Sequence, residues 1–435
     1  MALFRHIPAV EQLAIPGVSI LILFLAYSSQ YLFYYIDPGP LTKTQALWFN
    51  GFVLGIWWCY DRACTVDPGP RGWVRKIGLS GDEDDGEDAT LGKGERWCRK
   101  CNAVKPPRAH HCKQCARYMF YSLGYSDNLL MPYRCIPKMD HHCPWTTNCV
   151  SLTTFPHFLR FVLYAVISMS ILAYHLLQRI LPLWENRNLP AYLGPPTWAM
   201  AHLFVLVLVN SITLFALSIL LVRSIYSLAI NTTMIESWEI ERHEALVDRG
   251  RKTGGYVYAN GQKMRVEQQE FPYDVGIWRN ICQGMGTNIF PLWVLPFGGA
   301  PAIEKAKEYP VNGFENPGKS WPPPDPDKMP RNWRPSAEEV REYESRGEEI
   351  DAFKKRQQKD YERWNGKSGS RVLELEDSDE YESEYEEGMD GEEGWTNSEG
   401  DRLRDYGVDE EEDLLADDDI PLGELLRRRK ARAAE

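Results

Sequence analysis

Four long stretches of the 435-residue chain contain no charged residue, and they constrain its fold more than any other feature. They run from Leu13 to Ile36, from Thr44 to Tyr60, from Phe161 to Gln178 and from Trp198 to Val222. A helix that crosses the hydrocarbon core of a bilayer needs about 20 mostly apolar residues, with a range of roughly 17 to 25. The sequence therefore predicts four transmembrane helices. The second stretch is the weakest, and its alternative interpretation is a buried helix of a soluble domain.

Lysine and arginine are distributed unevenly over the segments that connect these stretches. The segment from Asp61 to Arg160 is rich in both, whereas residues 36–43 and 179–197 contain few. Because Lys and Arg accumulate in cytoplasmic loops, we expect the central segment, the N-terminus and the C-terminal region to be cytosolic. The predicted fold class is an all-α polytopic membrane protein that carries a small cytosolic domain and is embedded in the lipid bilayer.

The acidic character of the chain comes from one region. Between Glu374 and Asp419 there are 23 acidic and two basic residues, a local charge of −21, so the rest of the chain is +9 although the whole is −12. This region has few aliphatic residues, and a Pro-rich, then charged segment precedes it. Such compositions cannot bury enough apolar surface to fold. Residues 321–435 are therefore predicted to be a disordered, acidic tail.

Seven of the ten cysteines lie between Cys98 and Cys149, together with four histidines. They occur in the motifs CRKC, HHCKQC and DHHCPWTTNC, with a further cysteine between the last two. Structural zinc is held by four thiolate or imidazole ligands, which are often presented in pairs with this spacing. Two zinc ions would use eight of these groups and leave a surplus. An odd number of cysteines also cannot pair completely as disulfides, which favours a reducing compartment.

The surplus raises the question of what Cys143 does, since it directly follows Asp140, His141 and His142. A thiolate that is not bound to zinc but lies beside a histidine is nucleophilic at neutral pH. A neighbouring imidazole and carboxylate could activate and orient such a nucleophile. The alternative is that Cys143 is one more zinc ligand, and ligand spacing alone leaves both interpretations open.

These residues resemble those of a known family. The stretches CRKCNAVKPPRAHHCKQC and CIPKMDHHCPWTTNCV closely resemble the cysteine-rich domain of DHHC protein S-acyltransferases, also called palmitoyltransferases. Asp67 to Gly69 (DPG) and Thr232 to Glu236 (TTMIE) are similar to two further elements of that family. The segment that begins at Pro272 resembles the C-terminal part of its fungal endoplasmic-reticulum subfamily. The resemblance implies a multi-pass enzyme of the endoplasmic-reticulum membrane with cytosolic termini.

The resemblance also implies a role for each residue of the cluster. Its metal ligands would be Cys98, Cys101, His111 and Cys135 for one zinc ion, and Cys112, Cys115, His142 and Cys149 for the other. Its catalytic residues would be Cys143 as the nucleophile, His141 as the base, Asp140 as the orienting carboxylate, and Thr233 as a hydrogen-bond partner of Asp140. Its residues in contact with CoA would be Lys105, Arg108 and His110.

The reaction implied is the transfer of a long-chain acyl group from acyl-CoA, such as palmitoyl-CoA, to a cysteine of a membrane-associated protein through acyl-Cys143. Two structural Zn²⁺ ions and acyl-CoA are the expected cofactor and co-substrate. The expected partners are membrane proteins with juxtamembrane cysteines, such as chitin synthase. Two other classes of function compete with this one: a membrane-tethered zinc module that binds proteins or nucleic acid, and an adaptor that only presents substrates. Aromatic residues for base stacking are not interleaved with the basic ones, so no nucleic-acid partner is expected.

One segment departs from the family pattern. Seventeen residues, Tyr118 to Arg134, lie between Arg117 and Cys135, and without them the sequence would be CKQCARCIPKMDHHCPW. Because the segment is rich in apolar residues and its 17 codons preserve the reading frame, our hypothesis is that it is translated intron sequence. The expected domains are residues 1–60 (two transmembrane helices), 61–156 (the zinc domain, with the insert at 118–134), 157–223 (two transmembrane helices), 224–320 (a cytosolic region with TTxE) and 321–435 (the tail).

Overall fold

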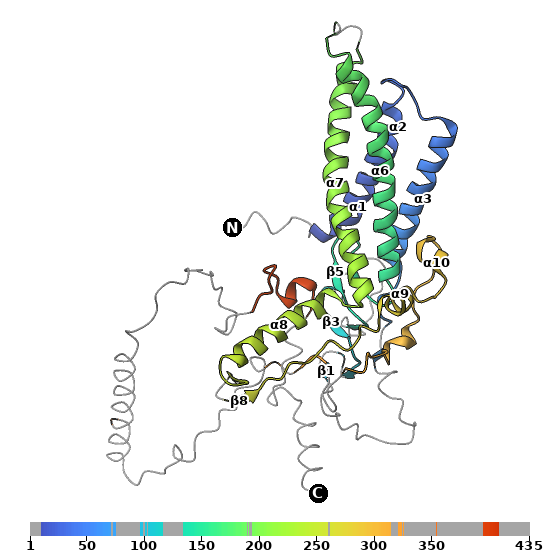
Figure 1. The fold of residues 1–435 in the computed structure, drawn as a ribbon. Helices are drawn as coiled ribbons and strands as arrows, with labels where there is room; N and C mark the ends of the chain where they lie inside the picture. Colours follow the sequence, from blue (N-terminus) through green and yellow to red (C-terminus); the bar gives the residue numbers. More distant parts are fainter. Residues whose placement is uncertain are drawn as a thin grey trace.

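The computed structural model describes residues 10–70, 73–74, 96–98, 101, 103–115, 134–188, 190, 194–259, 262–314, 321–323, 325, 354 and 395–408. Its long helices stand side by side in one bundle, and short β-hairpins lie at one end of that bundle (Figure 1). The bundle consists of α1 (Val10–Leu23), continued by the π-helical turn η1 (Phe24–Ser28) and by α2 (Ser29–Leu32), then α3 (Lys43–Thr65), α6 (Phe155–Glu185) and α7 (Thr197–Ile230). This arrangement confirms a mostly helical protein.

Three segments of the bundle are long and apolar enough to cross a membrane: Leu13–Leu32, Phe155–Glu185 and Thr197–Ile230. The second charge-free stretch of the sequence forms α3, which does not reach the same mean hydropathy because tryptophan and polar side chains interrupt its apolar residues. A helix of 23 residues is still about 35 Å long, enough to span the hydrocarbon core. Three candidate spans are thus found, and a fourth remains a proposal.

Small and polar side chains bring α3 close to its neighbours. A Cβ added at Gly55 would lie 2.4 Å from the Tyr164 ring of α6, so these two helices meet where one of them has no side chain. Gln30 of α2 and Asn50 of α3 exchange two amide hydrogen bonds of 3.1 and 3.0 Å. Small residues and interhelical amide bonds are the devices by which helices associate in lipid, where burial of apolar surface gives no driving force.

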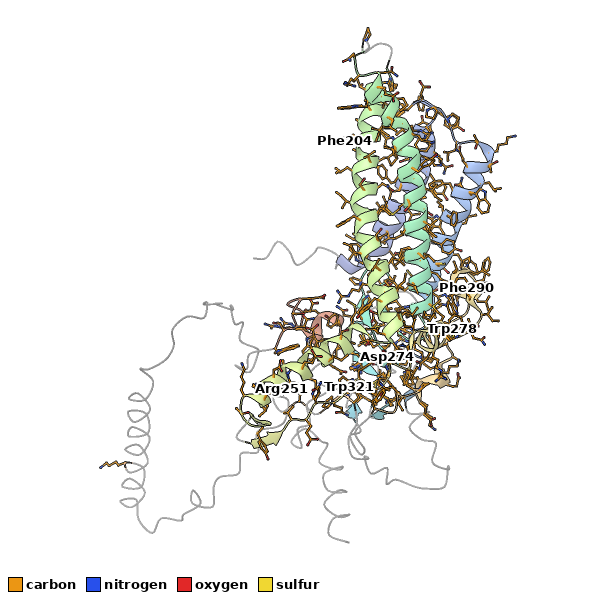
Figure 2. All side chains as sticks on the ribbon, viewed as in Figure 1. Phe204, Arg251, Asp274, Trp278, Phe290 and Trp321 are labelled. Carbon is orange, nitrogen blue, oxygen red and sulfur yellow. The ribbon has the colours of Figure 1, made fainter. Side chains whose placement is uncertain are left out.

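Apolar side chains cover the outside of the bundle. Figure 2 shows Phe204 pointing away from α7, and its side chain is 69% exposed. Further exposed apolar residues of α7 are Ile212, Phe215, Ile219 and Val222. A large exposed apolar surface is unusual for a soluble protein but suits contact with lipid. The protein is therefore a multi-pass membrane protein.

In the part of the chain that the structure describes, four two-stranded antiparallel hairpins lie beyond the end of the helix bundle. They are β1 (Arg96–Cys98) with β2 (Ala103–Lys105), β3 (His110–Cys112) with β4 (Arg134–Ile136), β5 (His141–Cys143) with β6 (Asn148–Val150), and β7 (Tyr256–Ala259) with β8 (Gln262–Arg265). Helix α8 (Met234–Arg251) follows α7 after a sharp turn at Asn231, whose φ of 56° is left-handed and ends α7. The turn directs the start of α8 toward the hairpins (Figure 1).

The segment after β8 returns to the bundle. It forms α9 (Ile277–Met285), α10 (Phe290–Val294) and the short 3-10 helix η3 (Ile303–Ala306). Arg160 of α6 is fully buried and donates hydrogen bonds to the carbonyl oxygens of Leu292, Trp293, Gly298 and Gly299. One arginine thereby satisfies four carbonyl groups of a tight turn that cannot bond to one another.

The prediction that the whole of 321–435 is disordered is wrong for two short pieces. Trp321 packs against Phe271, and Asp325 pairs with Arg242 of α8. Residues 395–408, which include the 3-10 helix η5 (Leu403–Tyr406), pack on α8 and on the hairpins. These residues interrupt the acidic run with Trp395, Leu403, Tyr406 and Val408, and these apolar side chains are what the packed segment buries. Most of the 118–134 insert lies outside the described residues, so the intron hypothesis stays a prediction.

Candidate functional site

Alternation along two short strands decides where the Cys and His side chains point. Successive residues of a strand face opposite sides. On β3, His111 and Cys112 therefore join different groups of ligands. On β5, His142 joins a ligand group, while its neighbours His141 and Cys143 share the other face of the strand. The DHHC motif thus presents one ligand on one side and a thiol with an imidazole on the other.

Two groups of four Cys and His residues have ligand atoms that all lie within 4.8 Å of one another. The first consists of Cys98, Cys101, His111 and Cys135, and the second of Cys112, Cys115, His142 and Cys149. The hairpins build them, since His111 pairs with Cys135 across β3–β4 and His142 with Cys149 across β5–β6. Both groups contain the same residues as the two ligand sets that the family resemblance implies.

Both groups have the donor chemistry and spacing of a structural metal site. In the second group, Nδ1 of His142 lies 3.6, 3.5 and 3.5 Å from the sulfur atoms of Cys112, Cys115 and Cys149. In the first, Nδ1 of His111 lies 3.3 and 3.5 Å from the sulfur atoms of Cys98 and Cys101. Tetrahedral zinc with bond lengths of about 2.3 Å to sulfur and 2.0–2.1 Å to nitrogen needs donors at this mutual distance. The residues present can therefore hold a metal ion in each group.

Among the described residues, Cys143 belongs to neither group. Its side chain is 4% exposed and packs against Val150, Phe158 and Val162 at the start of α6. His141 lies on the same face of β5, and its Nδ1 atom is 2.7 Å from Oδ2 of Asp140. The arrangement is a thiol, an imidazole and a carboxylate in a largely apolar site at the end of the membrane helices.

The electrostatics of this site favour a charged pair. Burial alone disfavours the charged form of His141, but its hydrogen bonds to Asp140 and Cys143 outweigh burial and raise its pKa to about 10. Burial likewise disfavours a thiolate at Cys143, yet the hydrogen bond from His141, and then those from Thr146, lower its pKa. An imidazolium beside a thiolate is the state that makes a cysteine nucleophilic.

The prediction that Thr233 hydrogen-bonds Asp140 is wrong. Oδ1 of Asp140 instead accepts a 2.8 Å hydrogen bond from the backbone N–H of Met234. The hydroxyl of Thr233 accepts from the N–H of Glu236, and the Glu236 carboxylate accepts from the N–H of Thr233, a capping box that starts α8. Thr233 therefore acts on Asp140 only through the helix that it begins.

The residues expected to contact CoA are buried, and one of them has another role. Arg108 is 3% exposed and is bound through Nε and Nη2 to both carboxylate oxygens of Glu236, at 2.5 and 2.6 Å. Its guanidinium also lies over the ring of Tyr273, 4.5 Å from the centroid. The burial and the ion pair support a structural role for Arg108, and its contact with CoA stays a prediction. Lys105 and His110 are also buried in the cysteine-rich domain.

Sequence reasoning did not predict how α3 holds the site. Asn148 of β6 donates from its side chain to the carbonyl oxygens of Ala63 and Val66, at 3.0 and 2.8 Å, and so caps the end of α3. The hydroxyl of Tyr60 donates to the carbonyl oxygen of Trp145 in the DHHC loop at 2.8 Å. Unsatisfied carbonyl groups at the end of a helix need such partners. In the sequence, the only sign of this contact with α3 is the asparagine between the two cysteines of DHHCPWTTNC.

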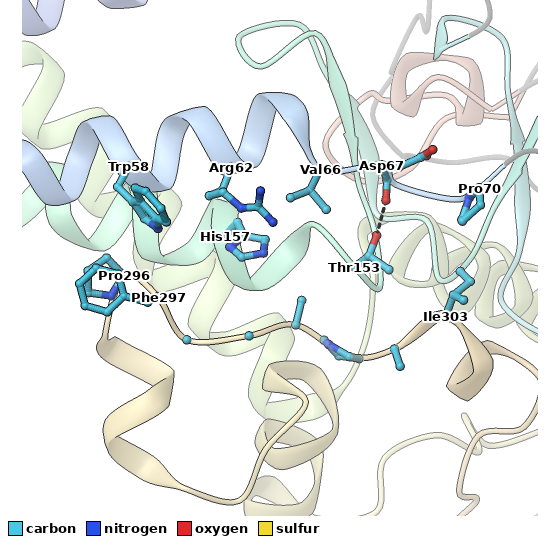
Figure 3. Close-up of a pocket in the computed structure, with 15 residues that line it drawn as sticks. Trp58, Arg62, Val66, Asp67, Pro70, Thr153, His157, Pro296, Phe297 and Ile303 are labelled. Carbon is cyan, nitrogen blue, oxygen red and sulfur yellow. Dashed lines mark hydrogen bonds between the residues drawn. The ribbon is translucent and has the colours of Figure 1, made fainter.

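The DPG element lies beside the first Cys and His group. Asp67 accepts a 2.7 Å bond from Arg134, the residue directly before the ligand Cys135. A Cβ at Gly69 would lie 2.9 Å from Pro137, so only glycine allows this approach. Figure 3 shows that Thr153, just before α6, donates its hydroxyl to the carbonyl oxygen of Asp67, at 2.9 Å. DPG thus connects the end of α3 with both the metal-ligand domain and α6.

A cavity of about 520 Å³ lies between α3, α6 and the segment from Pro296 to Ile303, and Figure 3 shows the residues that line it. Trp58 and Arg62 line it from α3, one turn apart, and His157 lines it from α6. At 100° per residue, Tyr60 lies about 160° around α3 from Trp58 and Arg62. Since Tyr60 is the residue that contacts the DHHC loop, the cavity is on a different face of α3 from the thiol, and Cys143 does not line it.

Comparison with known proteins agrees with this geometry. The model of the family described as DHHC palmitoyltransferase matches residues 133–241, from β4 into α8. The chain is 47% identical to the palmitoyltransferase pfa4 of Aspergillus fumigatus, over 97% of this chain and 98% of that protein. It is 46% identical to the palmitoyltransferase pfa4 of Emericella nidulans, over 98% of each. A probable protein S-acyltransferase 13 of Arabidopsis thaliana is 33% identical over 47% of this chain and 65% of its own length.

Proposed function

This chain belongs to the DHHC palmitoyltransferase family and is a protein S-acyltransferase, and we propose that it works through an acyl thioester on Cys143. The observation that carries this proposal is the separation made by β5. His142 faces the second group of ligands, while Cys143 and His141 face the other way. The thiol is left outside both groups of donors and beside a base.

In the first step, the Cys143 thiolate attacks the carbonyl carbon of a long-chain acyl-CoA. A carbon–sulfur bond to Cys143 forms, the bond to the CoA sulfur breaks, and the His141 imidazolium donates its proton to the departing CoA thiolate. In the second step, His141 takes the proton of a substrate cysteine, whose thiolate attacks acyl-Cys143 and releases the Cys143 thiolate. Each step exchanges one thioester for another, so the enzyme needs to supply proximity and a thiolate rather than driving force.

Asp140 fixes the ring of His141 so that its other nitrogen faces the thiol. It is itself held by the N–H of Met234 at the start of α8, which places a helix N-terminus beside the carboxylate. The two groups of Cys and His would hold two Zn²⁺ ions, which when bound supply the crosslinks that keep the short hairpins folded. Acyl-CoA would place its chain among the membrane helices and its head group on the cytosolic side.

We further propose that the protein is an endoplasmic-reticulum enzyme with cytosolic termini, acting on membrane proteins with cysteines close to a span, such as chitin synthase. The sequence resemblance to the fungal endoplasmic-reticulum subfamily supports this location. The basic residues of the central segment support the orientation.

The test is self-acylation of the purified protein with labelled palmitoyl-CoA. The wild type should acquire label that neutral hydroxylamine removes, and Cys143→Ser should acquire none. Cys282→Ser is the matched control, because this half-exposed cysteine of α9 lies in neither ligand group, and it should label like the wild type. Undiminished label in Cys143→Ser would contradict the assignment, and a metal-loaded wild type that never labels would favour an adaptor.

A further inference from the structure

Residues 395–408, here called the docked tail segment, pack against the enzyme although acidic sequence surrounds them. Three apolar side chains of the segment are nearly inaccessible: Leu403, Tyr406 and Val408 are 3%, 5% and 2% exposed. They share one core with Ile235 and Trp238 of α8. Trp395 adds an edge-on ring contact with Trp238, with centroids 4.9 Å apart.

The segment also pairs with the backbone of the cysteine-rich domain. The carbonyl oxygen of Gly407 accepts a 3.1 Å hydrogen bond from the N–H of Lys113, and Val408 forms an antiparallel bridge with Cys112. The indole N–H of Trp238 donates to the carbonyl oxygen of Asp401 at 3.1 Å. Because Cys112 is the last residue of β3, the tail extends the edge of the hairpin that carries a ligand of the second group.

Contact with that second group is direct. The buried core that contains Leu403, Tyr406 and Val408 also contains three of its four members, Cys112, Cys115 and Cys149. The fourth, His142, lies against Gly407. A Cβ added at Gly407 would be 2.8 Å from Cβ of His142, and the φ of 84° at Gly407 also suits only glycine.

Charge does not explain why the segment is held there. Its clearest ion pair, Glu399 with Arg223 at 3.0 Å, joins side chains that are 50% and 41% exposed. Such exposed pairs contribute little to stability. The apolar contacts and the backbone pairing with β3 are therefore the specific part of the interaction.

We propose that the docked tail segment is an integral part of the metal site formed by the second ligand group. It covers the Cys112, Cys115, His142 and Cys149 group, slows the loss of its metal ion, and fixes His142 and with it the neighbouring Cys143. The proposal rests on the ligand set proposed above. It extends the folded part of the enzyme beyond the Pro-rich segment to include residues 395–408.

Two glycines of the segment provide a matched pair for the test. Gly407 and Gly400 both have positive φ, 84° and 85°, so alanine strains the backbone equally at both. Only at Gly407 would the new methyl group meet His142, whereas nothing lies within 4 Å of a Cβ at Gly400. The full-length Gly407→Ala and Gly400→Ala proteins, loaded with zinc, should be mixed with a chromogenic chelator. Contacts that support metal ligands typically change metal affinity 10–100-fold.

The expected result is that one of two zinc equivalents leaves Gly407→Ala about tenfold faster than it leaves the wild type. Gly400→Ala should match the wild type. Amide hydrogen exchange in residues 142–150 should be faster in Gly407→Ala than in the wild type, because His142 no longer packs against the tail segment. The proposal would be overturned if both glycine variants released zinc at the wild-type rate. It would also be overturned if both released zinc faster than the wild type.

A second matched pair covers the case in which Gly407→Ala does not fold. Leu403 is buried and Arg404, its neighbour in η5, is exposed, so only Leu403→Ala should accelerate zinc release. Zinc release does not depend on the thiol. If Cys143→Ser keeps its label while the glycine variants differ in zinc release, the catalytic assignment fails and the tail proposal stands. If Cys143→Ser loses its label while the glycine variants release zinc at the same rate, the catalytic assignment stands and the tail proposal fails.

Discussion

Arg108 joins the cysteine-rich domain, α7 and α8 through one side chain. It reaches from the cysteine-rich domain to Glu236 at the start of α8, and its Nη2 donates to the carbonyl oxygen of Asn231 at the end of α7 at 2.6 Å. The backbone of Arg108 itself has a positive φ of 63°. A buried charge pair with several hydrogen bonds fixes geometry more than it adds stability.

Replacing Arg108 by methionine should therefore destabilise the protein by about 3–5 kcal/mol, because Glu236 is left as a buried, unpaired charge. The double variant Arg108→Met with Glu236→Gln should be less destabilised than the single one, since glutamine keeps the capping box without the charge. Unfolding of both proteins in detergent measures this. A single variant that keeps its stability but has a raised KM for acyl-CoA would support the predicted contact with CoA instead.

Lys138 is a second buried cation, and its Nζ donates to the side-chain oxygen of Asn231 at 2.6 Å. Burial, and then the nearby Arg108, lower the pKa of Lys138 to about 7. Between pH 7 and the unfolded value of about 10.4, the unfolded chain binds more protons than the folded one, so this residue makes stability rise with pH.

The stability of the wild type relative to Lys138→Met should therefore rise by roughly 1 kcal/mol per pH unit between pH 7 and pH 9.5. Comparing the two unfolding curves at several pH values removes the contribution of all other groups. A difference that is constant across this range would show that Lys138 stays charged in the folded protein.

At the scale of elements, the start of α8 positions Asp140, the carboxylate of the proposed catalytic site. The capping box fixes the first turn of the helix, and the N–H of Met234 in that turn holds Asp140. Neither the TTxE motif nor its position after the fourth hydrophobic stretch indicates which atom makes this contact, because a side chain and a backbone N–H one residue apart are equally compatible with the sequence.

Thr233→Ala should reduce stability by about 1 kcal/mol through loss of the cap. It should also slow self-acylation, since Asp140 loses a rigid donor. Thr233→Ser, which keeps the capping oxygen, should retain both properties. If alanine and serine variants acylate at the same rate, the start of α8 is not what positions Asp140.

The hairpins show what the sequence could and could not predict at this scale. The family resemblance implied the two ligand groups, whereas motif spacing alone left open whether Cys143 is a ligand. The reason that His142 is separated from His141 and Cys143 is strand alternation, and a three-residue strand such as β5 has no periodicity long enough to predict. Arg108 illustrates the opposite limit, since basic character in the sequence says nothing about whether a carboxylate from 128 residues away will cover it.

At the scale of the whole molecule, the main question is whether the 118–134 insert is part of the folded enzyme. Arg134 pairs with Asp67 and lies opposite Cys112 in the β3–β4 hairpin. If residues 118–134 are deleted, Arg117 takes the place directly before Cys135. The shortened chain therefore keeps an arginine for Asp67.

The deletion variant should bind at least as much zinc as the full chain and self-acylate at least as fast. Closing a shorter loop costs slightly less entropy, and the deletion removes a segment that is rich in apolar residues. Metal analysis and palmitoyl-CoA labelling of both proteins measure this. A deletion variant that loses the first metal ion would indicate that the inserted residues are part of the folded enzyme.

The docked tail segment shows why composition misled the prediction of disorder. Averaged over residues 374–419, charge dominates, yet folding of a short segment depends on a few apolar side chains that find a preformed surface. Trp395, Leu403, Tyr406 and Val408 were visible in the sequence. The surface that receives them, on α8 and β3, exists only in the folded protein.

The bonds from Asn148 and Tyr60 to the end of α3 have a consequence for client choice. They fasten the DHHC loop to a helix of the bundle. If Cys143 is the nucleophile, as proposed above, its sulfur keeps a fixed height relative to the membrane helices and cannot move toward a distant acceptor. A client must bring its own cysteine to that height. Proteins whose cysteine is a few residues from a span would be modified efficiently, and moving that cysteine outward along a stiff linker should abolish its modification.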